Sequence, residues 1–360
     1  MRLLIINSAK EWGGTEKWAL YTAHGLAEMG HTVFFGCRGE MFQERALKKN
    51  VVFVKFPFSN NADIRSVVKI RTFLKRNKID VVLPTKQREY FLAGIAAKLA
   101  KVKVAGLYGI DRPIHNLRNW IVFCKLFDIV FVNAKKIVEV LAKTKAFDTN
   151  KCKLVYVGVE PISLSDTIRK QSRKSLGIKE HEVCLMGIGR VAAQKGFDYA
   201  ITALALLVKK HPDVKLVLIG SGDIDHYRQL AVECGVEDKV VFTGFRDDIH
   251  ELVQAMDIFW LPSRSEGIPN TMLEAMSAGK PVVAFEIAGV AEIIKNGVNG
   301  YVVPFENVDL FYTTTATLIE NPSLMKQIGD KGYTTVRTEY SMEKMCRDTE
   351  RYLIEAIQIK

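Results

Sequence analysis

The chain has 360 residues, of which 48% are hydrophobic and 25% charged, and its formal net charge is +11 at pH 7. One hydrophobic core rarely serves more than about 250–300 residues, so this length predicts two domains. Six cysteines are scattered without CxxC spacing, which argues against a zinc site or a disulfide framework and indicates buried thiols in a reducing compartment.

The N-terminal apolar run, Leu3 to Ile6, is too short for the core of a signal peptide, so export is not expected. The most apolar long region, residues 120–132, contains Lys125 and Asp128, so no membrane-spanning helix is expected. These features predict a cytoplasmic protein whose contact with a membrane, if it makes one, is peripheral.

Apolar strand-like runs alternate with amphipathic helical stretches, the order that builds parallel sheets with right-handed crossovers. The predicted fold class is therefore α/β. Strands of the first domain are expected near residues 3–7, 32–37, 51–56, 80–84, 104–107, 129–133 and 154–157. Strands of the second domain are expected near residues 183–189, 215–219, 240–243, 258–261, 281–285 and 301–303.

The expected boundaries follow from where this alternation stops. The first domain is predicted over residues 1–162 and the second over residues 181–341. Residues 163–180 are polar, charged and without a hydrophobic period, so they are assigned to a linker. A last helix, within residues 342–360, is expected to pack back on the first domain.

The net charge is unevenly distributed along the chain. Residues 1–160 carry 28 Lys and Arg against 13 Asp and Glu, a net charge of +15, whereas residues 161–360 carry 23 against 27, a net charge of −4. This asymmetry predicts an anionic partner for the first domain, and leaves open a membrane surface, a phosphorylated acceptor and nucleic acid.

Two segments of the first domain concentrate this charge. Residues 64–78 have the pattern of a basic amphipathic helix suited to anionic lipid, and a surface helix packed on an α/β sheet has the same pattern. Residues 112–127 interleave basic residues with Trp120, Phe123 and Phe127, which also fits single-stranded nucleic acid. No RNA-binding or helix-turn-helix signature accompanies them, so nucleic acid is not an expected partner.

Gly13 and Gly14 lie at the turn between the first strand and the first helix, where a bare backbone can approach a phosphate or a sugar. Glu16, in the first turn of that helix, is interpreted as an acid stabilised by the helix dipole rather than as a ligand.

The second domain opens with GIGRVAAQKGFD, residues 187–198, where a strand ends in glycines and a helix begins after Lys195. Arg190 can bind a diphosphate with its planar guanidinium and Lys195 can act as a point charge, so both would neutralise a leaving nucleotide. The segment lacks the third glycine of a dinucleotide fingerprint and the lysine pattern of a P-loop. Its glycines alone are therefore weak evidence, and a solvated surface remains the alternative for either cation alone.

The most informative segment is SRSEGIPNTMLEAMSAGKPVVAF, residues 263–285. Glu266 lies on a loop after a buried strand, and Glu274 lies on the following helix. An ionised carboxylate can accept two hydrogen bonds from vicinal hydroxyls, so the pair suits a ribose and a pyranose. Isolated glutamates are usually solvated, but the small-residue helix that follows needs no acids for packing.

The loop between these two glutamates has features that suit a ligand. Gly267 lets the backbone approach a ligand closely, and Pro269, which has no amide hydrogen, shapes the loop. Free amides at the start of the helix would face anionic oxygens, and they belong to Ile268, Asn270 and Thr271.

Together these motifs resemble the retaining GT-B glycosyltransferases, in particular the large group 1 or family 4 type marked by Glu, seven residues, Glu. The resemblance covers essentially the whole chain and implies an α/β fold of two Rossmann-like domains facing a cleft. It rests on five motifs, Gly13-Gly14, Gly189-Arg190, Lys195-Gly196, Gly244-Phe245 and Glu266-Gly267-Ile268-Pro269-Asn270 with Glu274-Ala275.

The resemblance also implies roles for these residues. Arg190 and Lys195 would hold the diphosphate, Glu266 the donor sugar and Glu274 the ribose. The backbone of Gly244, Phe245 and Arg246 would meet the base. Transfer would retain the anomeric configuration and need no cofactor or metal, because protein cations replace the metal. Asp223-Ile224-Asp225 matches a metal-binding signature of a different glycosyltransferase fold and is interpreted as a false positive.

One position departs from the family pattern. Many relatives carry a histidine after the strand near residues 104–107, where this chain has Tyr108 in the run GLYGIDRPIHN. Asp111 is the expected substitute on the acceptor side. His115 is the nearest histidine, and its basic, aromatic surroundings equally fit a surface residue.

The expected activity is transfer of a sugar from a nucleoside-diphosphate sugar, with UDP as the expected nucleotide, to an anionic, membrane-associated acceptor such as a lipopolysaccharide core or another glycolipid. The expected location is the inner face of the membrane. The alternatives are a transferase for a small soluble acceptor, a GT-B epimerase and a non-catalytic membrane-docking module of the same fold.

Overall fold

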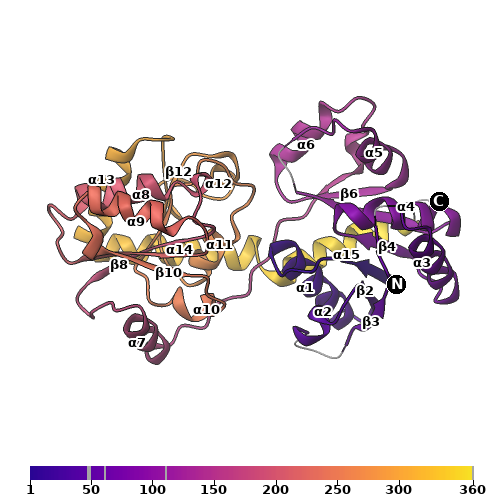
Figure 1. The fold of residues 1–360 in the computed structure, drawn as a ribbon, viewed down its shortest axis with the longest axis horizontal. Helices are drawn as coiled ribbons and strands as arrows, with labels where there is room; N and C mark the ends of the chain where they lie inside the picture. Colours follow the sequence, from indigo (N-terminus) through magenta and orange to yellow (C-terminus); the bar gives the residue numbers. More distant parts are fainter. Residues whose placement is uncertain (47–49, 61, 110–111, 359–360) are drawn as a thin grey trace. The chain divides into compact units, whose positions relative to one another are not determined.

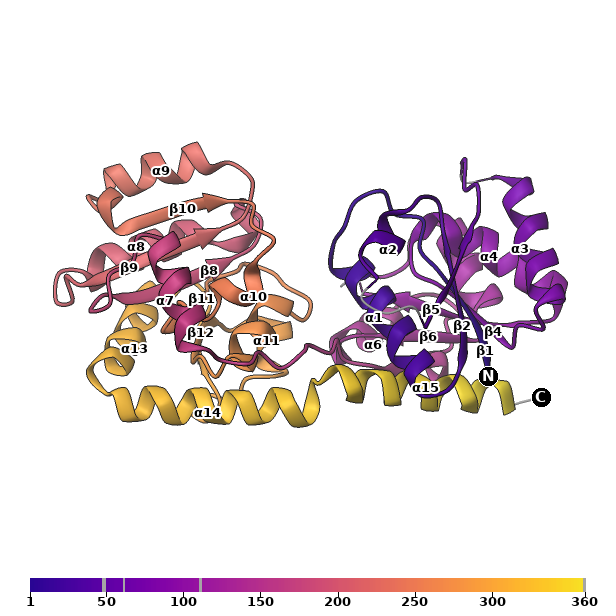
Figure 2. The same cartoon turned by 90° about the horizontal axis from the view of Figure 1, so that it is seen from below.

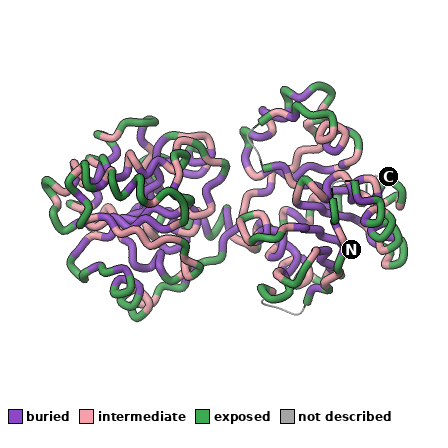
Figure 3. The backbone as a smooth tube through the Cα atoms, in the orientation of Figure 1, coloured by how far each residue is buried: buried purple, intermediate pink, exposed green. Residues whose placement is uncertain are grey.

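The computed structural model describes residues 1–46, 50–60, 62–109 and 112–358, and the chain divides into two compact units (Figure 1). The first unit comprises Met1–Gly158 and Met342–Lys360, and the second comprises Val159–Ser341. Buried residues follow the strands of each unit, so each sheet lies within a core of its own (Figure 3). No helix in the described part of the chain is both long and apolar enough to cross a membrane.

The first unit contains a seven-stranded parallel sheet in the order β3-β2-β1-β4-β5-β6-β7. All seven predicted strands are present, and β7 begins and ends earlier than predicted because a short 3-10 turn leads directly into it. The strands are β1 Arg2–Ile6, β2 Thr32–Cys37, β3 Val52–Lys55, β4 Val81–Pro84, β5 Lys103–Tyr108, β6 Ile129–Val132 and β7 Cys152–Leu154.

Most crossovers between these strands contain a helix, as expected for parallel neighbours. The helical elements are α1 Gly14–Glu28, α2 Met41–Glu44, α3 Ile64–Arg76, α4 Gln87–Ala100, α5 Leu117–Trp120, the π-helix η1 Ile121–Leu126, α6 Lys135–Ala142, the 3-10 helix η2 Thr149–Lys151 and the C-terminal α15 Met342–Gln358.

The second unit contains a six-stranded parallel sheet in the order β10-β9-β8-β11-β12-β13, with every predicted strand in place. Its strands are β8 Val183–Ile188, β9 Val214–Ile219, β10 Val240–Gly244, β11 Ile258–Leu261, β12 Val282–Phe285 and β13 Tyr301–Val303. Its helical elements are α7 Asp166–Ser175, η3 Ala193–Lys195, α8 Phe197–Leu207, α9 Ile224–Glu233, η4 Glu237–Lys239, α10 Ile249–Leu252, α11 Asn270–Ser277, α12 Ala288–Ala291, α13 Val308–Glu320 and α14 Pro322–Glu339.

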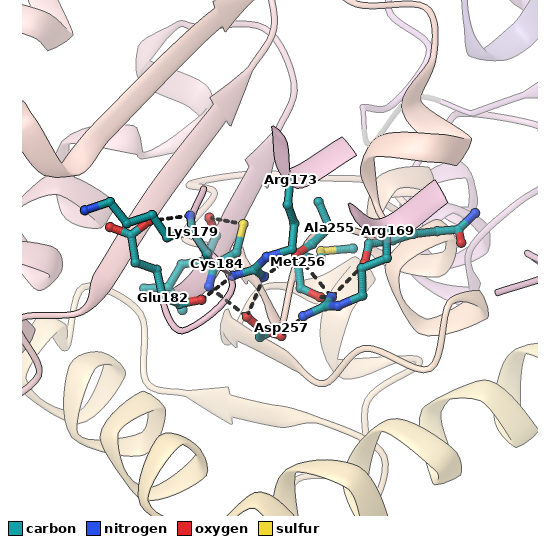
Figure 4. A network of polar contacts seen from close by, with 10 residues as sticks. Arg169, Arg173, Lys179, Glu182, Cys184, Ala255, Met256 and Asp257 are labelled. Carbon is teal, nitrogen blue, oxygen red and sulfur yellow. Dashed lines mark hydrogen bonds and ion pairs between the residues drawn. The ribbon is translucent and has the colours of Figure 1, made fainter. Parts of the chain in front are cut away.

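The segment assigned to a linker, residues 163–180, contains α7, so that assignment is wrong for most of it. Arg169 and Arg173, one turn apart on α7, donate to backbone carbonyls beyond the end of α10 and to the carboxylate of Asp257 (Figure 4). The Arg173 side chain is only 4% exposed. The side of α7 that faces the rest of the unit is therefore formed by arginine side chains, which explains why this helix has no hydrophobic period.

Helix α15 packs against α1 in the first unit (Figure 2). Met345, Cys346 and Leu353 of α15 are buried there. A Cβ atom built on Gly25 of α1 would lie 2.3 Å from Sγ of Cys346, so the two helices are in contact at this glycine. At the edge of the contact, Nε2 of His31 lies 2.5 Å from Oε1 of Glu350.

One acidic side chain lies fully inside the first unit. Glu89, on α4, is 0% exposed and accepts hydrogen bonds from the hydroxyl of Ser8 at 2.5 Å and from its amide at 3.3 Å. Burial raises the pKa of Glu89 to about 7, although the bonds from Ser8 act in the opposite direction. Glu89 therefore anchors the loop that follows β1.

Gly25→Ala is expected to destabilise the chain by about 1–3 kcal/mol, because the new methyl group must displace Cys346 between two packed helices. Denaturant unfolding of the full chain measures the change. Gly39→Ala is the matched control, since nothing lies within 4 Å of a Cβ built there. Adding Cys346→Ala to Gly25→Ala should recover part of the loss, and a purely additive pair of substitutions would contradict the proposed contact.

Glu89→Gln tests the buried carboxyl. A free glutamate titrates near pH 4.3, so the folded state holds the proton more tightly than the unfolded chain. This contribution to stability is complete below about pH 4 and is lost as the pH rises through about 7, by an amount on the order of 3 kcal/mol. Relative to Glu89→Gln, the unfolding free energy of the wild type should fall across this window. Parallel pH profiles would contradict the assignment.

Candidate functional site

The strand order of the second sheet reverses between β8 and β11, so the loops after these two strands diverge and leave a ligand-binding position at their carboxyl ends. Lys195 follows β8 and Glu266 follows β11, 71 residues later, and Nζ of Lys195 lies 2.6 Å from Oε1 of Glu266. The hydroxyl of Ser263 donates to the same oxygen at 2.9 Å. The structure therefore brings the predicted cation and the predicted loop carboxylate together.

Glycines make this approach possible. Gly189 has φ +152°, and a Cβ built on it would lie 2.5 Å from Cε of Lys195, so the lysine side chain passes directly over this residue. Gly196 has φ +65°, and its Cβ would lie 1.9 Å from the carbonyl oxygen of Pro262. A side chain at Gly196 would push apart the two loops that carry the ion pair, and one at Gly189 would displace the side chain of Lys195.

Arg264 ties the two loops together and was not singled out from the sequence. Its guanidinium pairs with both carboxylate oxygens of Asp198, at 2.9 and 2.6 Å, and donates to the carbonyl of Ala193 at 2.6 Å. Burial alone would raise the pKa of Asp198, but the hydrogen bonds and charge of Arg264 hold this pKa below its ordinary value. The available signal was an arginine two residues before Glu266 and an aspartate at the start of α8.

Glu274 lies on α11, half-buried, with Ile268 and Pro269 buried in the loop before it. A Cβ built on Gly289 would lie 1.4 Å from the carbonyl oxygen of Gly267, so α12 packs tightly against this loop and fixes it. The hydroxyl oxygen of Thr271 is buried and has no hydrogen-bond partner within the described ranges. This unpaired hydroxyl can form a hydrogen bond with a ligand at the start of α11.

Two further predicted elements border this position in different ways. Arg190 is exposed directly after β8 and Gly189. At the end of β10, Gly244 has φ +71° and Phe245 is 76% exposed, which leaves its ring available to a planar ligand. The guanidinium of Arg246 is paired with Asp248, with Nε 2.7 Å from Oδ1.

The predicted residues of the first unit are only partly brought together. Gly13 precedes α1 with φ −166°, an extended conformation open to any residue. Glu16 lies in the first turn of α1, as interpreted from the sequence, and it is buried, with its carboxylate 2.7 Å from Nζ of Lys86. Tyr108 is buried, and its hydroxyl donates to the carbonyl of Arg112 at 2.7 Å.

Two acceptor-side candidates remain. Asp111 lies outside the described residues, and His115 is exposed. Neither is assigned a role by the geometry of its neighbours.

The Asp-x-Asp sequence on α9 has local partners. The carboxylate of Asp223 accepts from the amide of His226 at 3.4 Å as the cap of α9, and Asp225 pairs with Arg228 at 3.0 Å. Within residues 1–46, 50–60, 62–109 and 112–358, no group of three or more His, Cys, Asp or Glu side chains could hold a metal ion.

Comparisons with known proteins cover nearly the whole chain. Residues 168–335 match the family model described as "Glycosyl transferases group 1", and residues 12–163 match "Glycosyltransferase Family 4". An uncharacterized glycosyltransferase of Haemophilus influenzae is 26% identical over 93% of this chain and 95% of its own length.

A UDP-Gal:alpha-D-GlcNAc-diphosphoundecaprenol alpha-1,3-galactosyltransferase of Escherichia coli is 26% identical over 73% of this chain and 72% of its own length. The crystal structure of HepE of Anabaena in complex with UDP and glucose has a TM-score of 0.84 at 19% identity, and covers 99% of this chain and 100% of that one. With two parallel-sheet Rossmann-like domains and matches along both of them, the chain belongs to the group 1 glycosyltransferases of the GT-B fold.

Proposed function

We propose that this glycosyltransferase is a retaining enzyme that moves a sugar from a nucleoside-diphosphate sugar, with UDP as the expected nucleotide, to an anionic acceptor held at a membrane. The observation that carries the donor part of the proposal is the Lys195–Glu266 pair, 2.6 Å apart across the strand-order reversal of the second unit. A cation and a carboxylate held side by side match the two chemistries of a sugar nucleotide, an anionic diphosphate and a ring of hydroxyls.

The proposed roles follow from where each side chain lies. Lys195 is 17% exposed beside the loop after β8 and would bind the diphosphate together with the exposed Arg190. Glu266, 11% exposed, would accept hydrogen bonds from the donor sugar. Glu274 on α11 would bind the ribose hydroxyls, and the backbone near Gly244 would meet the base.

Charge stabilisation is the main chemical contribution expected from these residues. When the bond between sugar and diphosphate breaks, negative charge grows on the leaving phosphate, and fixed cations stabilise it without reorganisation. Arg190 and Lys195 would supply this charge, so the proposed reaction needs no metal ion. Retention, by departure of the leaving group and attack of the acceptor on the same face, is proposed from the Glu-x7-Glu pattern of Glu266 and Glu274.

The membrane part of the proposal rests on α3. Its inner face is buried, with Ile70 and Leu74 in the core and Phe73 edge-on to two phenylalanines. Its outer face exposes Ile64 and Val68, which are 75% and 57% exposed. The same helix exposes five cationic residues, Arg65, Lys69, Arg71, Lys75 and Arg76. Exposed aliphatic side chains among cations suit the headgroup region of an anionic bilayer.

The other basic segment, residues 112–127, is a weaker candidate for this contact. Phe123 and Phe127 are each 1% exposed and pack on Tyr90, so these aromatics belong to the core. Trp120 donates its indole hydrogen to the carbonyl of Lys145 at 2.7 Å. An acceptor on a membrane lipid is also consistent with the E. coli relative, whose named acceptor is a diphosphoundecaprenol.

Thermal unfolding with UDP, GDP and ADP tests the donor site. A nucleotide at about 100 times its dissociation constant should add ~2.7 kcal/mol of stability, and Lys195→Gln or Glu274→Ala should remove most of it. Lys326→Gln is the matched control, because Nζ of Lys326 also lies 2.6 Å from a carboxylate, that of Asp330. Stabilisation that survives in Lys195→Gln would contradict the diphosphate role, and no stabilisation by any nucleotide would favour the non-catalytic module.

Vesicle sedimentation tests α3. Val68→Ser combined with Lys69→Ser should weaken binding to phosphatidylglycerol vesicles, by about 1 kcal/mol for the lost cation and further for the lost aliphatic contact. Raising the salt concentration should weaken wild-type binding. Val298→Ser, at an exposed valine of the second unit, is the control. Equal binding of all three proteins would exclude α3 as the contact.

A further inference from the structure

The first unit has a strand-order reversal of its own, between β1 and β4. The loop after β1 carries Asn7 and Ser8 and leads to Glu16 in the first turn of α1, while Lys86 lies two residues after the end of β4. Nζ of Lys86 lies 2.7 Å from Oε1 of Glu16. In a parallel α/β sheet this is the position at which a ligand is expected, because the two crossovers leave it in opposite directions.

The same arrangement occurs in both units. In each, a lysine after one central strand pairs with a glutamate after the neighbouring central strand, at 2.7 Å in the first unit and 2.6 Å in the second. The two lysine side chains differ in their exposed fraction. Lys195 is 17% exposed, whereas Lys86 is 39% exposed over a glutamate that is 4% exposed. The ammonium group of Lys86 is therefore the accessible part of its pair.

The surroundings of Lys86 are rigid. Glu16 also accepts a hydrogen bond from the side-chain amide of Asn7 at 3.2 Å, which fixes the carboxylate that holds the lysine. Glu89 fixes the neighbouring residue, Ser8, through two hydrogen bonds. An ammonium group has three donors, and Glu16 is the one side chain paired with Lys86 among the described residues.

The charge of the site also selects its ligand. Glu16 is buried, and Lys86 and Asn7 both bond to its Oε1, so the charge of this carboxylate is already balanced by the lysine. Helix α4 begins directly after Lys86, so the lysine lies at the end of the helix where the dipole favours negative charge. An ammonium group at this end of a helix matches an anionic oxygen better than a neutral hydroxyl.

We propose that Lys86 binds an anionic group of the acceptor, a phosphate, at the carboxyl ends of β1 and β4, with Glu16 holding the lysine in place. This inference rests on the proposed function and narrows its acceptor to a molecule with a phosphate close to the hydroxyl that receives the sugar. It assigns a binding residue to the first unit, where the sequence had pointed to Asp111.

The test measures stabilisation by inorganic phosphate in the presence of saturating UDP, so that the proposed diphosphate position of the second unit is already occupied. Phosphate is expected to raise the Tm of the wild type further than sodium chloride of equal ionic strength. Lys86→Gln should weaken the affinity for phosphate about tenfold or more, the value of a charge-assisted hydrogen bond. Lys98→Gln is the matched control, since Lys98 is 41% exposed and pairs with Asp128 in the same unit.

Lys86→Gln leaves Glu16 buried without its cation, which can prevent folding. If the single variant does not fold, the double variant Glu16→Gln with Lys86→Gln is measured in its place. Lys86→Arg should keep the response to phosphate. A response unchanged in Lys86→Gln or in the double variant, or no response of the wild type to either inorganic phosphate or phosphatidic acid vesicles, would overturn the proposal. Phosphatidic acid vesicles in place of inorganic phosphate distinguish a lipid phosphate from a free one. Stabilisation by the vesicles alone identifies a lipid phosphate, provided that Lys86→Gln removes this stabilisation.

The same samples separate this inference from the proposed function. If UDP itself gives no stabilisation, the donor site fails and the proposed function with it. If UDP stabilises every variant but neither phosphate nor phosphatidic acid vesicles stabilise the wild type, only the role of Lys86 fails.

Discussion

The functional part of this chain depends on one steric constraint, the contact of two loops that follow neighbouring central strands of the second sheet. Gly196 of the loop after β8 meets the backbone of Pro262 after β11, and within the first of these loops Gly189 lies under the side chain of Lys195. These contacts allow an ammonium and a carboxylate that are 71 residues apart to meet at 2.6 Å. A half-buried pair of opposite charges is stable only where the backbone holds both partners at that distance. The donor chemistry proposed for Lys195 and Glu266 follows from this placement.

In several places polar side chains stabilise the fold although the sequence pattern around them predicts a different role. Residues 163–180 have the composition of a linker, but Arg169 and Arg173 saturate the carbonyls beyond α10 and the carboxylate of Asp257. Hydrophobic periodicity cannot detect a helix whose buried face is guanidinium, because the partners that make burial favourable lie about 80 residues away in the sequence. Glu16 is a similar case, since its partner Lys86 belongs to another crossover.

The two basic segments of the first unit have similar sequence patterns but different environments in the structure. Residues 64–78 and 112–127 both combine cations with apolar residues, and the sequence pattern suits either a surface or a core. In the structure, Phe123 and Phe127 are enclosed by Tyr90 and Tyr108, whereas Ile64 and Val68 remain exposed among cations on α3. A difference in tertiary packing, not in composition, separates a core segment from a candidate membrane contact.

The sequence by itself determined the α/β class and the parallel strands of both units, and it singled out the glycines, cations and glutamates of the proposed donor site, because these depend on local periodicity and on short motifs. It could not determine the tie between Arg264 and Asp198, the burial of α7 or the pairing of Glu16 with Lys86. Those were decided by tertiary structure, because each requires residues from different crossovers to meet, and the distance between crossovers depends on strand order and packing.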